Sequence, residues 1–145
     1  MAADGIQYAG EFTISDAKIF SSSGNIVPLE GLVQSITIFE NMYRPSMTGM
    51  ITILDTNSLV KNLPIVGQEF LSFKIKTSSI TGTLKEDIID FTENVFNIYK
   101  IDNRIIDGKI EVLALHFASG EKLLNSRVRV SKSYTNSIND IVQDV

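Results

Sequence analysis

The stretch GQEFLSFKIKT, residues 67–77, decides the fold class, because apolar and polar side chains alternate along most of its length. The two alternating sets are Leu71, Phe73 and Ile75 on one side, and Ser72, Lys74 and Lys76 on the other. A period of two is typical of a β-strand with one face toward a core and the other toward water. The sequence therefore predicts a strand here, with the apolar set buried and the polar set solvated.

The same alternation recurs on the N-terminal side, in two runs separated by a short loop. The runs LVQSITIFE (32–40) and TGMITILD (48–55) flank NMYRPSM (41–47), in which Pro45 has no N–H to donate to a ladder. Two such runs around a turn predict a β-hairpin. Both runs carry apolar residues on both faces, so we expect each face to be covered over part of its length.

A second hairpin is predicted toward the C-terminus. Residues 95–104 alternate, DGK (107–109) is a tight-turn signal, and the run IEVLALHFAS (110–119) follows. We expect 95–104 to pair with 110–118. Because the second run is almost entirely apolar, it is expected to be the most buried strand of the chain.

One more strand is expected at residues 12–19. Its apolar residues move from even to odd positions near Ser15 and Asp16, which indicates a change of face, and the breaker-rich SSSGN (21–25) then predicts a turn. The chain thus has about six predicted strands with turn signals between them. A closed or partly closed antiparallel β-barrel fits this pattern, since closure removes exposed edge strands.

Two helices are expected beside the strands. Cap candidates and helical spacing predict a short helix near 57–63, which Pro64 ends. The C-terminal stretch TNSINDIVQDV (135–145) begins a helix at about residue 137, where Ser137 and Asp140 have the spacing of a capping box. Its apolar stripe consists of Ile138, Ile141, Val142 and Val145. So short a helix is marginal in water, so we expect the stripe to pack on the barrel or a neighbouring chain, or to fray.

Composition excludes several classes of protein. The chain has 145 residues, of which 43% are hydrophobic and 21% charged, so it is neither disordered nor membrane-embedded in bulk. No apolar run approaches the ~18–20 residues of a membrane helix, and we expect no membrane insertion. The chain contains no cysteine, which excludes disulfides, zinc–thiolate sites and a cysteine nucleophile, and accords with synthesis in a cytoplasm.

The charge balance argues against a nucleic-acid-binding domain. The net charge is −4, whereas such domains usually present a basic face. The densest basic stretch is SRVRVSK (126–132), in which cations and valines alternate. This pattern favours a strand with one solvated side, and a contact surface for another protein is the alternative.

Motifs for catalysis and for metal binding are weak. His116 is the one histidine of the chain, and the patterns G-x-S-x-G and Gly-Lys-Ser/Thr do not occur. The carboxylates Glu86, Asp87 and Asp90 lack the order of a calcium loop, and Gly67 is expected to permit a tight turn. We therefore predict a protein that is not an enzyme and has no cofactor or metal. The alternative is a small ligand-binding or hydrolytic β-barrel that uses His116 and the acidic stretch 83–93.

Four stretches, in order, resemble the baseplate hub family of contractile-tailed phages. They are FTISDAKIFSSSGNIVPLEGLVQSITIFENMY (12–43), MTGMITILDTNSLVKNLPIVGQEFLSFKIKT (47–77), FNIYKIDNR (96–104) and HFASGEKLLNSRVRVSKSYTNSINDIVQDV (116–145). The resemblance extends from about Phe12 to Val145 and departs mainly at 78–92. It is specific in the order and spacing of its pieces rather than in any single motif.

The resemblance implies a structural role in the virion. Hub subunits of this kind form trimeric rings with two tube-type barrels per chain, giving a pseudo-sixfold ring between the central spike and the tail tube. The implied partners are further copies of the chain, the spike, the tube protein and other baseplate proteins, with DNA only as passing cargo. Residues 1–130 then correspond to one tube-type barrel, and 131–145 to the start of a following domain that looks truncated. A tailocin or a type VI-like secretion system is the alternative setting.

The loop 41–47 is the expected contact surface within such an assembly. An exposed tyrosine and an exposed arginine are typical anchors of protein interfaces. The predicted contact residues are Met42, Tyr43, Arg44 and Pro45 of this loop, together with Ile138, Ile141, Val142 and Val145 of the C-terminal stripe.

Overall fold

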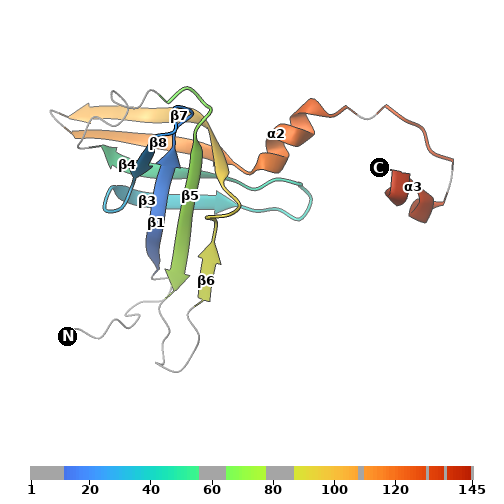
Figure 1. Ribbon diagram of the computed structural model, residues 1–145, viewed down its shortest axis with the longest axis horizontal. Coiled ribbons are helices and arrows are strands. Elements are labelled where there is room, and N and C mark those ends of the chain that lie inside the picture. Colours follow the sequence, from blue (N-terminus) through green and yellow to red (C-terminus); the bar gives the residue numbers. More distant parts are fainter. Residues whose placement is uncertain are drawn as a thin grey trace.

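The computed structural model describes residues 12–55, 65–77, 87–107, 110–129, 131–135 and 137–144. Within these ranges the chain is mainly β, with eight strands in one antiparallel sheet and two helices after them (Figure 1). The strands are β1 (Thr13–Phe20), β2 (Ile26–Pro28), β3 (Val33–Phe39), β4 (Thr48–Asp55), β5 (Phe70–Thr77), β6 (Asp87–Asp90), β7 (Phe96–Asp107) and β8 (Ile110–Ala118). The helices are α2 (Gly120–Arg127) and α3 (Ile138–Asp144).

The sheet folds across itself at the junction of β5 and β7. The strand order is β2-β1-β5-β7-β8-β4-β3, and β6 pairs with β5 beside this path. Figure 1 shows β1, β5 and β6 running across β3, β4, β7 and β8. Only two register pairs join β5 to β7, whereas eight join β7 to β8. The sheet therefore consists of two groups of strands that meet at a sharp bend.

The hydrophobic core lies between these two groups. Its fully buried side chains come from both, among them Ile19, Leu71 and Phe73 from the first and Ile51, Ile53, Ile98, Leu113, Leu115 and Phe117 from the second. Phe73 packs against Phe91, Phe96 and Phe117, with ring centroids 5.1, 5.5 and 5.9 Å away. Burial of a phenylalanine side chain stabilises a fold by about 1.5–3 kcal/mol, so this cluster is the main link between the groups.

Both predicted hairpins are confirmed. β3 pairs with β4, and β7 pairs with β8, each in antiparallel register. In β4 the side chains alternate between buried and partly exposed positions along the whole strand. β8 is the most buried strand, as its apolar sequence predicted, with Leu113, Leu115 and Phe117 inaccessible to solvent.

The predicted change of face in the first strand is a β-bulge. Asp16 has φ 53°, a left-handed conformation that is uncommon outside glycine but tolerated by aspartate. The register between β1 and β5 shifts between Ser15 and Lys18, so that Asp16 and Ala17 together oppose Phe73. The bulge turns Ala17 into the core and leaves Asp16 on the surface.

The predicted mainly β, antiparallel class is confirmed, whereas the described strands do not close into the closed or partly closed barrel that was expected. The sheet ends at β2 on one side and at β3 on the other, so it is curled but open. β2 has three residues and ends on Pro28, which has no N–H to donate. Residues of β1 and β3 line a hollow of about 330 Å³ instead of pairing with each other. The estimate of six strands was low because β2 and β6 are too short to show a periodic pattern.

Two predictions about polar residues also fail. Ser72 was expected in water, yet only 2% of it is exposed, because its short side chain lies opposite the longer Lys18 in the register of β1 and β5. The basic stretch 126–132 was expected to be a strand. Arg127 instead ends α2, and Val128, Arg129, Ser131 and Lys132 belong to no strand. α2 carries this stretch away from the sheet, where it meets no strand edge (Figure 1).

Other expectations concern residues that the structure does not describe. The helix near 57–63 and most of the loop 78–87 lie outside the described ranges.

The C-terminal helix is confirmed as α3, and its capping box forms, since Ser137 Oγ lies 2.8 Å from Asp140 Oδ2 and the backbone N–H of Asp140 donates to the same hydroxyl over 3.4 Å.

Gly49→Ala should destabilise the fold by about 1–3 kcal/mol, the usual cost of overpacking a core. Gly49 lies opposite Phe117 in the register of β4 and β8, and an added Cβ would overlap the Phe117 ring and stand 2.5 Å from the carbonyl oxygen of Thr37. Urea unfolding measures the change. Gly120→Ala is the matched control, because nothing lies within 4 Å of its Cβ position and alanine favours a helix. Equal stability of the two variants would contradict this packing.

Candidate functional site

The tip of the β3–β4 hairpin stands beside a surface groove. A hollow of about 500 Å³, which we call the tip groove, is lined by the hairpin tip, by the end of β6 and the start of β7 with the loop between them, and by the start of α2. The lining residues are Glu40, Asn41, Met42, Arg44, Pro45, Ser46, Met47, Asp90, Phe91, Asn94, Phe96, Ser119 and Glu121. Its apolar lining includes Met42, Met47, Phe91 and Phe96. Three segments that are distant in the sequence thus meet at one end of the sheet.

Hydrogen bonds hold the hairpin tip in place. The side-chain oxygen of Asn41 accepts a hydrogen bond from the backbone N–H of Tyr43 over 2.9 Å. The backbone carbonyl of Asn41 accepts a second one from the N–H of Arg44 over 3.0 Å. At the base of the tip, Met47 and Ser119 exchange two hydrogen bonds, from Met47 N to Ser119 Oγ (3.1 Å) and from Ser119 N to Met47 O (2.9 Å). The tip is therefore an ordered projection tied to the β8–α2 junction.

The predicted contact residues of this loop are all exposed. Met42 and Tyr43 are 89% and 88% exposed, the highest fractions among the large apolar side chains that the structure describes. Met42, Arg44 and Pro45 line the tip groove, whereas Tyr43 is not among its lining residues. A projection with apolar residues at its end is typical of a surface that contacts another protein.

The tip groove is predominantly acidic. Its lining includes the carboxylates Glu40, Asp90 and Glu121 and one cation, Arg44. The hydroxyl of Ser119 hydrogen-bonds to Glu121 and is the main reason that the pKa of this carboxyl lies below its ordinary value. The pKa of Asp90 is also lowered, chiefly by the hydrogen bond that the Thr92 hydroxyl donates and next by the N–H of Thr92. Both carboxylates are therefore ionised at neutral pH.

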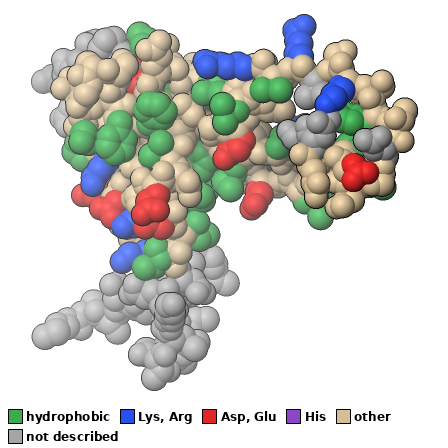
Figure 2. Space-filling model, turned by 45° about the vertical axis from the view of Figure 1, so that its right-hand side comes forward, with side chains coloured by type: hydrophobic (Ala, Val, Ile, Leu, Met, Phe, Trp, Pro, Cys, Tyr) green, Lys and Arg blue, Asp and Glu red, His purple; other side chains and the backbone are tan. Residues whose placement is uncertain are grey.

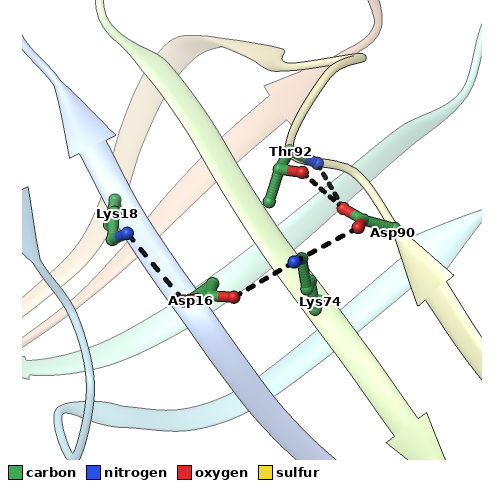
Figure 3. A network of polar contacts seen from close by, with 5 residues as sticks. All are labelled: Asp16, Lys18, Lys74, Asp90 and Thr92. Carbon is green, nitrogen blue, oxygen red and sulfur yellow. Dashed lines mark hydrogen bonds and ion pairs between the residues drawn. The ribbon is translucent and has the colours of Figure 1, made fainter.

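A chain of charges leads from β1 to the groove (Figure 3). Lys74 on β5 lies between Asp16 and Asp90, with its Nζ 3.3 Å from an oxygen of each, and Lys18 lies 3.9 Å from Asp16. Thr92 donates to Asp90 from its N–H over 2.8 Å and from its hydroxyl over 2.6 Å. This network fixes β6, which has no other strand partner than β5 among the described residues.

The side-chain contacts that the structure shows for His116 are with β7, and none of them involves residues 87–93, the described part of the acidic stretch 83–93. Its Nε2 is 3.6 Å from Asp102 Oδ2 on β7, and Lys100 pairs with the same carboxylate. Tyr99 lies beside His116 with ring centroids 6.1 Å apart, and Lys122 of α2 sits 4.3 Å from the Tyr99 ring centre. The alternative hydrolytic site, which combined His116 with 83–93, gains no support from this geometry. Among the described residues, no group of three or more His, Cys, Asp or Glu is arranged to hold a metal ion.

Glu69 is a buried carboxylate that no sequence pattern singles out. It is inaccessible to solvent, and it accepts hydrogen bonds from the N–H groups of Val66, Gly67 and Gln68 over 3.0, 2.9 and 3.1 Å. Gly67 has φ +90°, which confirms the tight turn predicted there. Successive N–H groups of this kind often bind an external anion, but here the chain's own carboxylate occupies the position.

The C-terminal stripe does not pack on the sheet. Ile138 and Val142 are 81% and 72% exposed, Ile141 is partly buried, and Val145 lies outside the described residues. Figure 1 shows α3 separated from the sheet by the segment that follows α2. Figure 2 shows basic side chains along the upper rim of this helical part and carboxylates below them. The stripe is thus an apolar surface without a partner in the described part of the chain.

No family model and no curated protein matches this chain. In the described part of the chain, no helix has the length and apolar character to cross a membrane.

Glu69→Gln should lower the free energy of unfolding by about 1–3 kcal/mol. The amide keeps one acceptor oxygen but turns an NH₂ group toward backbone N–H donors, so at least one buried donor loses its partner. Chemical denaturation checks this value. Glu93→Gln, at an exposed position of the neighbouring loop, should change stability by less than about 0.5 kcal/mol. A Glu69→Gln variant as stable as this control would show that the three hydrogen bonds to Glu69 contribute little to the stability of the fold.

Thr92→Val should raise the pKa of Asp90 toward 3.8, its ordinary value, because the main donor to the carboxylate is lost. A carboxyl whose pKa is lowered by folding stabilises the fold above its unfolded pKa and loses this contribution as pH falls through the folded pKa. The pKa of Lys74 is raised above 10.5, chiefly by the hydrogen bond to Asp16, so its contribution is complete below 10.5 and is lost as pH rises further.

Carboxyl ¹³C NMR titration measures the pKa of Asp90 directly. The control is Thr37→Val on β3, which makes the same chemical change away from the charge network and should leave the Asp90 titration unchanged. An Asp90 midpoint that is the same in Thr92→Val and in the unsubstituted chain would contradict the assignment of Thr92 as the main donor.

Proposed function

We propose that this chain is a structural protein of a phage tail baseplate hub, where its sheet is one unit of a ring between the central spike and the tail tube. The observation that carries the proposal is the hairpin tip, because Met42 and Tyr43 are almost fully exposed on a turn that hydrogen bonds hold in place. Exposure of two large apolar side chains at one tip is unfavourable in an isolated chain, and contact with another protein removes the cost.

The edges of the sheet support the same role. β3 is the last strand on one side of the described sheet, and Phe39 at its end is 62% exposed. An unpaired edge strand with apolar residues favours pairing with another chain. In our proposal the curled sheet is the tube-type unit, and the opening between its two edge strands, β2 and β3, is the seam of the barrel that the family resemblance implies.

The proposed partners follow from this role. They are further copies of the chain in a trimer, the spike, the tail tube protein and other baseplate proteins, all within the virion. DNA passes through the ring as cargo, and the net charge of −4 disfavours its retention on the wall. The protein performs no catalysis in this proposal.

Mass measurement in solution tests the proposal. Light scattering at rising protein concentration should detect association, and Met42→Ser with Tyr43→Ser should raise the dissociation constant at least about tenfold, as expected when two anchors are removed. Val66→Ser is the matched control, because Val66 is 67% exposed and lies away from the tip groove. A chain that stays monomeric and binds neither a spike nor a tube protein would overturn the proposed function.

A further inference from the structure

The basic segment 127–135, which we call the arm and of which the structure describes every residue except 130, belongs to no strand of the sheet. Arg127 ends α2, and Val128 has φ −95° and ψ 123°, so the chain becomes extended immediately after the helix. All described residues of the arm are exposed except Tyr134, which is partly buried. The described residues of this strand-like sequence thus lie outside the sheet.

The tip groove complements this segment in charge and in polarity. Of the three carboxylates in the groove, Asp90 is paired with Lys74, so Glu40 and Glu121 supply the negative charge beside the cation Arg44. The cations Arg127 and Arg129 of the arm have only Val128 between them. The apolar floor of Met47, Phe91 and Phe96 offers contacts to the side chain of Val128, which lies between Arg127 and Arg129 in the sequence. Complementary charge around an apolar floor favours binding in one register and discriminates against other segments.

We infer that the arm of one copy of this chain binds in the tip groove of a second copy. This inference rests on the proposed ring, for which it supplies the contact. The groove and the arm are different surfaces of the chain, so the contact is head to tail, which generates a ring if the rotation closes.

The position of α2 favours a second copy over the arm's own chain. Ser119 and Glu121 at the start of α2 line the groove, and the arm leaves from the other end of the helix. A helix of eight residues is about 12 Å long, so it carries the arm away from its own groove. Figure 1 shows the segment after α2 continuing away from the sheet.

The electrostatics also favour the arm over α3 as the occupant. α3 has Asp140 in its first turn and no basic residue in its last turn. Its charge therefore has the same sign as the groove, and like charges at close range oppose docking. The apolar stripe of α3 is better suited to a surface that is not acidic.

Peptide binding is the first test. The probe is a fluorescent peptide SRVRVSKSYT, residues 126–135, and the receptor is the full chain with Arg127→Glu and Arg129→Glu, whose own arm cannot compete. The peptide should bind, and binding should weaken as NaCl rises from about 50 to about 500 mM, because exposed charges are screened.

Matched receptor variants locate the binding site. Adding Glu40→Gln and Glu121→Gln to this receptor should weaken binding at least about fivefold, whereas adding Glu30→Gln and Glu93→Gln, two exposed carboxylates outside the groove, should leave it unchanged. Circular dichroism and thermal unfolding confirm that each receptor is folded. Absence of binding, equal loss in both receptors, or tighter binding of a peptide of residues 137–145 would overturn the inference.

A mixing experiment separates a second copy from the same chain. One variant has a reversed groove (Glu40→Lys and Glu121→Lys), and the other has a neutral arm (Arg127→Gln and Arg129→Gln), which the reversed groove does not attract. Each alone should be monomeric, and the mixture should form a heterodimer and nothing larger, because only one groove and one arm remain functional. No heterodimer would overturn the inference. Self-association of each variant as strong as that of the unsubstituted chain would also overturn the inference, but it would not contradict the proposed ring.

Discussion

The packing of Phe73 against Phe96 and Phe117 is the interaction on which the rest of the structure depends. β5 and β7 share only two register pairs, so backbone hydrogen bonds join the two groups of strands over a short length. The aromatic rings extend this junction into the core, with centroids 5.5 and 5.9 Å from that of Phe73. Gly49 leaves the space that the Phe117 ring occupies. Because residues 91–95 connect β6 to β7 next to this cluster, its packing also positions one wall of the tip groove.

Two carboxylates in the described part of the chain, Glu69 and Asp90, are engaged in interactions within the fold. Glu69 accepts hydrogen bonds from the backbone N–H groups of its own turn. Asp90 accepts hydrogen bonds from Thr92 and forms an ion pair with Lys74. The pKa of Asp90 is lowered, chiefly by the hydrogen bond from the Thr92 hydroxyl, so this carboxylate is a weak base, which disfavours a role in proton transfer. The apolar surfaces lack such internal partners, since the hairpin tip and the stripe of α3 remain exposed. The described part of the chain therefore combines carboxylates that internal hydrogen bonds hold in place with exposed apolar projections.

Much of the fold could be predicted from alternation alone. Six strands, both hairpins and the change of face at Asp16 follow from which positions are apolar, because a strand turns every second side chain to one side. The capping box of Ser137 and Asp140 is equally local, since both partners lie within one helical turn. For the candidate site, the sequence singled out the loop 41–47 by its tyrosine and arginine. It could not indicate the groove, whose other walls come from residues 90–96 and 119–121.

The sequence by itself determined which segments are strands and which face of each is apolar, because those properties depend on neighbours within a few residues. The tertiary structure decided how the strands are arranged: that the sheet stays open between β2 and β3, that Asp102 is the carboxylate beside His116, and that Ser72 is covered. It also decided that the basic segment after α2 is not a strand. Strand formation requires a partner edge, and a partner is a property of the whole arrangement rather than of the segment that carries the pattern.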